Sequence, residues 1–157
     1  MKLMISACLM GTRCRYDGGA YDSMVLQNRL EKCTLIPVCP EQLGGLPTPR
    51  PPSEIRNGRV ITRDGRVVSR DGRDVTEAFA RGAQEAEKIA RACGCECALL
   101  KERSPSCGSS IIYDGSFTGK RIPGEGVTTA LLRRSGITVF SENQLEELLA
   151  WIAAQGS

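Results

Sequence analysis

The chain has 157 residues and a formal net charge of +3, with 41% hydrophobic and 25% charged residues. These values predict one globular domain over residues 1–157 that can bury a core without disulfides. The small charge and an aromatic content of 4% argue against a platform for duplex or stacked nucleic acid, so we expect no stable nucleic-acid partner.

The cysteine and histidine counts narrow the chemistry. The sequence contains eight cysteines and no histidine. Without histidine there is no Ser-His or Cys-His nucleophile pair, so proton transfer falls to carboxylates, lysine, tyrosine, thiols or water. No apolar stretch is long enough for a signal peptide or a membrane span, which predicts a cytoplasmic protein. Disulfides are rare in that compartment, which favours metal ligands, reactive thiols or buried side chains.

Apolar runs and turn signals predict alternating strands and helices. In chain order we expect a strand at residues 3–9, a helix at 22–32, a strand at 34–38, a hairpin at about 55–73, a helix at 74–93, a strand at 97–100, an extended piece at 111–113, a helix at 127–134, a strand at 137–140 and a last helix from 141. The strands of the hairpin are expected at 60–62 and 67–69. The stretches 39–52 and 119–126 are typical of irregular loops.

This order of elements predicts an α/β fold. We expect a mostly parallel sheet of about four strands flanked by helices, Rossmann-like, with the small antiparallel β-hairpin as an insertion. In such folds ligands bind beyond the carboxyl ends of the strands. A candidate residue is therefore stronger when it follows a strand.

Three cysteines follow three different predicted strands. Cys8 ends the first strand, Cys39 ends the second, and Cys107 lies in the loop after the third. Three thiolates meeting at one sheet edge fit an iron–sulfur cluster with one open iron, or a catalytic zinc with an open position. Their spacing matches neither a ferredoxin run nor paired Cys-x-x-Cys knuckles, so the shared position carries the inference.

The other five cysteines are weaker candidates. Cys14 lies in the loop after the first strand and is either a fourth ligand or a nearby thiol. Cys33 is expected to pack at a helix end. The remaining three are expected to pack where a helix stops and a strand starts, with metal binding as the alternative: Cys93, Cys95 and Cys97.

Polar residues near the candidate ligands supply further groups. Glu41, two residues after Cys39, is either a general acid/base or a hydrogen-bond acceptor in its loop. Ser104 either binds substrate or forms the turn before a proline. Lys101 and Glu102 open the same loop as Ser104.

Other residues are expected to bind substrate. Tyr16 and Asp17 either line the mouth of the site or form a tight turn. Gly126 opens a helix whose free amides could hold an anion, although a simple helix start is the plainer interpretation. Lys101 and Ser106 complete the expected substrate-binding set. Four cations could recognise a phosphate or lie solvated at the surface, namely Arg13, Arg15, Arg50 and Lys120.

The assembled motifs resemble the thiouracil desulfidase family over nearly the whole chain and in the same order. The segments that carry the resemblance are Ile5-Ser6-Ala7-Cys8-Leu9-Met10-Gly11, Arg15-Tyr16-Asp17-Gly18, Pro37-Val38-Cys39-Pro40-Glu41, Gly44-Gly45-Leu46-Pro47-Thr48-Pro49-Arg50, Leu100-Lys101-Glu102, Ser104-Pro105-Ser106-Cys107-Gly108, Tyr113-Asp114-Gly115, Gly126-Val127-Thr128 and Phe140-Ser141-Glu142.

The resemblance implies a [4Fe–4S] cluster held by Cys8, Cys39 and Cys107, with a fourth iron free to take the sulfur of a thiocarbonyl. It also implies Glu41 as the catalytic glutamate and Ser104 as the active-site serine. The reaction would be a non-redox hydrolysis of a thiolated uracil compound to its oxo form and sulfide. The expected substrate is a small thiolated pyrimidine, either free 2-thiouracil or a 4-thiouridine-type nucleoside or nucleotide.

Two alternatives come from other classes of protein. The first is a non-catalytic zinc or metal-binding module, and the second is a thiol redox protein that uses the cysteines at 93, 95 and 97. Soft sulfur prefers iron or another soft metal, and the desulfidase reaction needs no histidine. Both points favour the enzyme.

Overall fold

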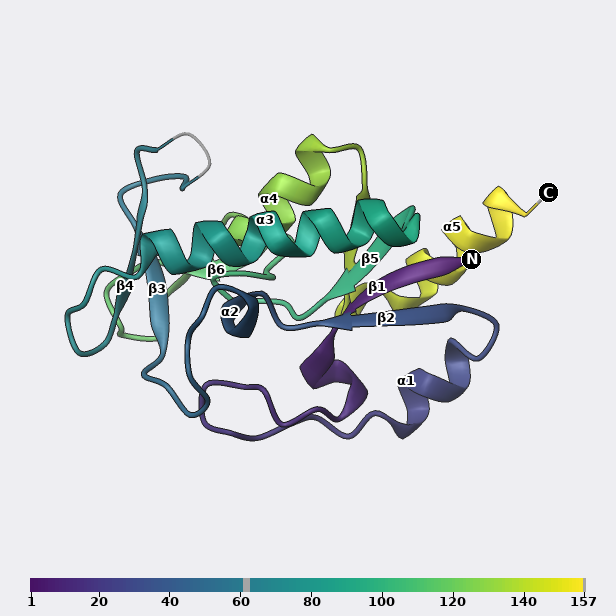
Figure 1. The fold of residues 1–157 in the computed structure, drawn as a ribbon, viewed down its shortest axis with the longest axis horizontal. Coiled ribbons are helices and arrows are strands. Elements are labelled where there is room, and N and C mark those ends of the chain that lie inside the picture. Colours follow the sequence, from purple (N-terminus) through teal and green to yellow (C-terminus); the bar gives the residue numbers. More distant parts are fainter. Residues whose placement is uncertain (61–62, 157) are drawn as a thin grey trace.

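The centre of the molecule is a four-stranded parallel sheet. The computed structural model describes residues 1–60 and 63–156. The sheet has the order β2-β1-β5-β8 (Figure 1). Its strands are β1 (Lys2–Ser6), β2 (Thr34–Val38), β5 (Cys97–Leu100) and β8 (Thr138–Ser141). All three pairings are parallel, which confirms the α/β fold expected from the sequence.

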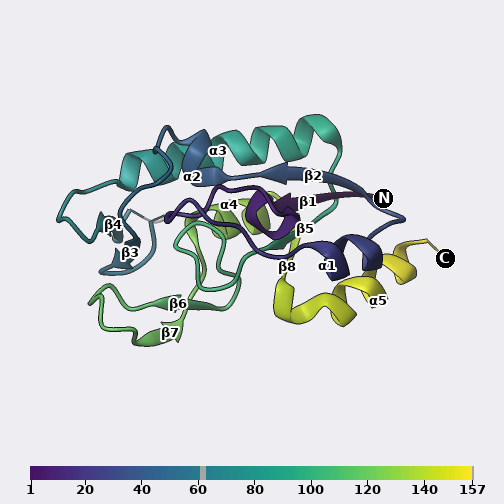
Figure 2. The ribbon, with the colours of Figure 1, turned by 90° about the horizontal axis from the view of Figure 1, so that it is seen from below.

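Helices cover both faces of this sheet. They are α1 (Met24–Arg29), α2 (Pro40–Leu43), α3 (Thr76–Cys93), α4 (Val127–Arg134) and α5 (Leu145–Gln155). Figure 2 shows α3 on one side of the sheet and α1 and α5 on the other. Alternate residues of β1 serve the two faces, because Met4 packs with α3 and α4 while Leu3 and Ile5 pack with Leu30 and Leu148.

The first strand is shorter than its apolar run. The chain leaves β1 at Ser6 and forms a single 3₁₀ turn, η1 (Ala7–Met10), which Gly11 closes at a φ of 90°. The strand expected at residues 3–9 was therefore too long at its end. This turn carries Cys8 over the edge of the sheet.

A one-turn helix replaces part of the expected irregular loop. Helix α2 begins directly after Cys39, with Pro40 in the first turn, where a missing N–H costs nothing. It packs very closely on α3: a Cβ at Gly44 would lie 1.9 Å from the carbonyl oxygen of Ala78, and one at Gly82 would lie 1.9 Å from that of Pro40. Glycine at both contacts thus lets α2 seat itself, which places Cys39 and Glu41.

The small antiparallel hairpin is present, but its first strand was placed wrongly. Strand β3 (Ser53–Arg56) pairs with β4 (Arg66–Ser69), with Ile55 opposite Val67. Val60, from the run expected to form that strand, lies in a turn, and residues 61–62 lie outside the described residues. The core explains the choice, because Ile55 and Val67 are buried together against Phe79.

Only one strand of a second two-stranded sheet was predicted from the sequence. Strand β6 (Ile111–Tyr113) matches the extended piece, while β7 (Arg121–Pro123) lies in a stretch predicted to be a loop. Near the end of the chain, Ser141 and Gln144 form the predicted capping box before α5, through the 3₁₀ turn η2 (Glu142–Gln144). Within the described residues, no helix has both the length and the apolar character needed to cross a membrane.

Candidate metal centre and active site

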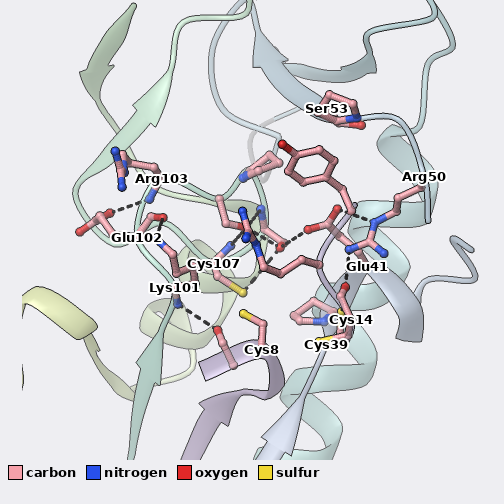
Figure 3. Close-up of a pocket in the computed structure, with 18 of the residues that line it drawn as sticks. Cys8, Cys14, Cys39, Glu41, Arg50, Ser53, Lys101, Glu102, Arg103 and Cys107 are labelled. Atoms are coloured by element: carbon pink, nitrogen blue, oxygen red, sulfur yellow. Dashed lines mark hydrogen bonds and ion pairs between the residues drawn. The ribbon is translucent and has the colours of Figure 1, made fainter. Parts of the chain in front are cut away.

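A pocket of about 430 Å³ opens where β1, β2 and β5 end. Four cysteine thiols line it: Cys8, Cys14, Cys39 and Cys107 (Figure 3). The position agrees with the rule that ligands bind beyond the carboxyl ends of parallel strands. Within residues 1–60 and 63–156, no three cysteine or carboxylate side chains converge on a point that would suit a single metal ion.

Two of the four thiols come from the loop after β1. Cys8 lies in η1, and Cys14 is only 2% exposed. The carbonyl oxygen of Cys14 accepts a hydrogen bond from Nη2 of Arg50 at 2.9 Å. The Cys39 thiol and then the Cys8 thiol are its main electrostatic neighbours; Cys39 lowers the pKa of Cys14, but Cys8 and burial outweigh it and raise that pKa to about 11.

Cys39 and Cys107 are held by the segments that follow β2 and β5. The hydrogen bond between Cys39 and Cys14 is the main cause that raises the pKa of the Cys39 thiol above its usual range, and burial is the second. Burial raises the pKa of Cys107 to about 12, although hydrogen bonds from Ser6 and Ser106 oppose that shift. Cysteines bind metals as thiolates, so a cationic centre would have to supply the charge that ionises these buried thiols.

The loop that carries Cys107 is organised by one buried carboxylate. Glu102 accepts hydrogen bonds from the backbone N–H groups of Ser109, Ser110 and Ile111 at 2.8, 3.1 and 3.2 Å, and from both serine hydroxyls. Burial alone would raise the pKa of Glu102, but these donors outweigh it and lower the pKa to about 2. The carboxylate therefore fixes residues 102–111 as one turn around its charge.

A second carboxylate faces the pocket between two partners. Oε1 of Glu41 accepts from Nε of Arg50 at 3.1 Å, and Oε2 accepts from the hydroxyl of Ser106 at 3.1 Å. The Ser106 hydroxyl also lies 2.9 Å from that of Ser104, whose oxygen accepts from the backbone N–H of Cys107 at 3.1 Å. Glu41 is thus joined by hydrogen bonds to the loop that carries Cys107.

Lys101 forms part of the opposite wall. Its Nζ pairs with Glu142 at 2.8 Å and lies 5.3 Å from the ring centre of Tyr21. The other carboxylate oxygen of Glu142 accepts from the backbone N–H of Glu102 at 2.7 Å. The backbone N–H of Lys101 donates to Ser6 at 2.9 Å. These contacts join the ends of β1, β5 and β8.

The structure brings together most of the residues expected from the sequence. The pocket is lined by the three expected ligands and by Tyr16, Glu41, Lys101, Ser104 and Ser106. Asp17 lies outside this lining; it accepts from the backbone N–H of Gly19 at 2.9 Å, as a turn residue does. Gly126 also lies outside, and a Cβ there would meet the carbonyl carbon of Ser106 at 2.4 Å. Its small size lets α4 pack against the loop that carries Cys107.

Arg50 has a different place from the one expected. The sequence suggested a phosphate contact or a solvated surface, but the side chain is buried and spans three segments. Its guanidinium donates to Glu41, to the carbonyl oxygen of Cys14, and to Pro47 and Thr48 of its own loop. No local pattern marks this role, because the partners are up to 36 residues away in sequence.

The remaining cysteines lie away from the pocket. Cys93 and Cys95 pack in the apolar cluster beneath α3, and Cys33 and Cys97 pack in the cluster on the other face of the sheet. The Cys97 sulfur lies 3.9 Å from the sulfur of Met1. Packing, as expected, accounts for all four.

The fold and the pocket define a class: a parallel α/β protein whose strand ends present cysteine thiols beside a half-buried carboxylate. The family model described as 2-thiouracil desulfurase matches residues 3–144. The chain belongs to this family. It is 41% identical over 150 residues to the uncharacterized protein YbbK of Bacillus subtilis, covering 94% of this chain and 99% of YbbK.

A solved structure is also similar. The structure described as [4Fe-4S]-dependent thiouracil desulfidase TudS superposes with a TM-score of 0.83 at 47% sequence identity, covering 98% of each chain. The family match and this similarity agree with the resemblance drawn from the sequence motifs.

Proposed function

We propose that this protein is an iron–sulfur-dependent desulfidase that hydrolyses thiolated uracil compounds to their oxo form and sulfide. The observation that carries the proposal is the meeting of Cys8, Cys39 and Cys107 with Glu41 in one pocket. The similarity of the whole chain to a [4Fe-4S]-dependent thiouracil desulfidase supports the same activity.

The cluster ligands in this proposal are Cys8, Cys39 and Cys107. The donor set fits the group, because thiolates are the usual ligands of iron–sulfur clusters and come here from three separate strand ends. When bound, the cluster supplies a Lewis-acidic iron that attracts the soft sulfur of a thiocarbonyl. The turn around Glu102 and the capped loop at Ser104 hold the Cys107 sulfur in place.

Proton transfer in this proposal belongs to Glu41. Its Oε2 accepts the proton of the water that attacks the carbon of the C–S bond. Arg50 holds Oε1, so the carboxylate cannot turn away from the pocket. Ser106 and Ser104 form a short chain of hydroxyls beside it, which positions the carboxylate and the attacking water.

The walls of the pocket suit a pyrimidine with an attached sugar and phosphate. The aromatic rings of Tyr16 and Phe117 line it, and so do Arg70 and Arg103; the guanidinium of Arg70 lies 5.7 Å from the ring centre of Phe117. Among the described residues no carboxylate pairs with either guanidinium, whereas Arg15 lies 3.8 Å from Asp17. We propose that Arg70 and Arg103 bind the phosphate of a thiouridine nucleotide. In this proposal residues 1–157 form a single domain. The β3–β4 hairpin and the residue after it, Arg70, supply one wall of its pocket.

The test is anaerobic purification followed by turnover. Iron and acid-labile sulfide are measured, and loss of the thiocarbonyl absorbance is followed with 2-thiouracil and with 4-thiouridine monophosphate. The proposal expects about four irons per chain, sulfide release, and faster turnover of the nucleotide. A colourless protein with one zinc per chain and intact substrates would refute it.

A further inference from the structure

The pocket holds one thiol more than the proposed ligand set. Cys14 lines the same space as Cys8, Cys39 and Cys107, and Figure 3 shows all four side chains around it. Figure 3 shows Cys14 beside Cys39, and the thiol of Cys14 is near enough to those of Cys39 and Cys8 for both to shift its pKa.

Burial in the core does not explain this residue. Cys14 is 2% exposed, yet the three apolar clusters found in the described part of the chain do not include it. They include the four cysteines outside the pocket and also Cys8 and Cys107, so within the pocket Cys14 shares its place outside the clusters with Cys39 alone. Cys14 therefore resembles the proposed ligand Cys39: it lines the pocket and packs in none of the apolar clusters, so its thiol faces the space where a cluster would lie.

The backbone holds Cys14 at this position. Its N–H donates to the carbonyl oxygen of Thr12 at 2.8 Å. Its own carbonyl oxygen accepts from Nη2 of Arg50 at 2.9 Å and lies 3.7 Å from the Cys39 sulfur. With the backbone fixed from two sides, rotation about the side-chain bonds is the motion left to the thiol.

We propose that Cys14 is an exchangeable fourth ligand, which occupies the open iron of the cluster until the substrate sulfur displaces it. The inference rests on the proposed function. In the exchange, the Cys14 thiolate would leave with the electron pair of its iron bond, and the substrate sulfur would donate the pair for the new bond. No electron is gained or lost, so no oxidant or reductant is required.

Competition by Cys14 has a measurable consequence. A ligand that occupies the open position nine-tenths of the time weakens the apparent affinity for substrate about tenfold. Cys14→Ala should therefore lower KM about tenfold without lowering kcat. A residue that merely supports the loop would act in the opposite direction, raising KM or reducing the cluster content.

A second measurement reports on the cluster without turnover. A cluster with an open iron loses that iron on mild oxidation with ferricyanide, and electron paramagnetic resonance detects the [3Fe–4S] product. Without substrate, wild type should convert more slowly than both Cys14→Ala and Cys14→Ser, the second variant keeping the side-chain size. Cys33→Ala is the matched control, because that cysteine packs away from the pocket, and it should convert as wild type does.

The outcomes separate this inference from the proposed function. Equal conversion rates in wild type and both Cys14 variants, with unchanged KM, would overturn the inference while desulfidase activity stands. Loss of the cluster from both variants would also overturn it, because Cys14 would then be a permanent ligand. A wild-type protein that binds no cluster would instead refute the proposed function.

Discussion

The two edges of the same sheet use cysteine in opposite ways. At the carboxyl edge, Cys8, Cys14, Cys39 and Cys107 line a pocket with Glu41 and Arg50. Toward the amino edge, Cys33, Cys93, Cys95 and Cys97 pack among aliphatic side chains. The residue type is the same, so topology decides which thiols can meet a ligand. Parallel strands bring loops from distant parts of the chain together at their carboxyl ends.

The largest effect is expected from replacing a proposed cluster ligand at the carboxyl edge. Replacing Cys39 or Cys107 by serine should remove the cluster and reduce desulfidase activity below detection, because each supplies one of three thiolates. Iron content, visible absorbance and sulfide release measure the loss. Cys33→Ser should keep colour and activity. Loss of the cluster in this variant would contradict the claim that only the cysteines at the carboxyl edge bind it.

The next effect separates cluster binding from catalysis within the pocket. Glu41→Gln should keep the full iron content and lower kcat by about 10²–10⁴-fold, because the amide cannot accept the proton from water. Steady-state kinetics on protein with measured iron content give the result. Unchanged kcat would assign Glu41 only to the support of its loop.

A smaller effect concerns the carboxylate that shapes the Cys107 loop. At neutral pH, Glu102→Gln should reduce the free energy of unfolding by about 2 kcal/mol, because buried N–H donors lose their charged acceptor. The fold lowers the pKa of Glu102 from 4.5 to about 2, so the ionised carboxylate stabilises the wild-type protein fully above pH 4.5. This stabilisation is lost as the pH falls toward 2 and the carboxylate takes up a proton.

The difference between wild type and Glu102→Gln should therefore shrink as the pH falls from about 5 toward about 3. Urea unfolding across this range measures the difference. A constant gap at every pH would mean that the charge of Glu102 contributes nothing to the loop. Glu85→Gln is a suitable control, since its partner Lys88 forms an exposed pair on α3.

A further effect of similar size tests how tightly the carboxyl edge is packed. Gly126→Ala places a methyl group 2.4 Å from the carbonyl carbon of Ser106 and 2.7 Å from the nitrogen of Cys107, so the loop must shift. We expect a loss of about 1–3 kcal/mol in stability and a lower cluster content. Gly156→Ala is the control for space, because its φ is −84° and a Cβ there would meet no atom closer than 3.8 Å.

Local patterns predicted the elements that have strong local signals. The strands at residues 34–38 and 97–100 and the helix at 127–134 begin and end where the sequence placed them. Helix α2 and strand β3 depend on tertiary contacts instead. The first needs the close approach of Gly44 and Gly82, and the second needs the shared core with Phe79.

The residues of the candidate site also separate into those that local patterns predict and those that depend on tertiary contacts. The strand-end rule was enough to predict that Cys8, Cys39, Cys107 and Glu41 meet in one pocket. The roles of Arg50 and Glu142 could not be predicted, because their hydrogen-bond partners lie 36 and 40 residues away in sequence. For Gly126 the sequence offered an anion site or a simple helix start, and the structure adds a tight contact with the backbone of the Cys107 loop that no local pattern marks.

The most direct test of the account is an anaerobic crystal structure of the cluster-containing protein. The account predicts one four-iron cluster at the carboxyl edge of the sheet, bound by the sulfur atoms of Cys8, Cys39 and Cys107, with Cys14 and Glu41 beside the remaining iron. Metal bound instead by Cys33, Cys93, Cys95 or Cys97, or a single zinc ion in the pocket, would contradict it.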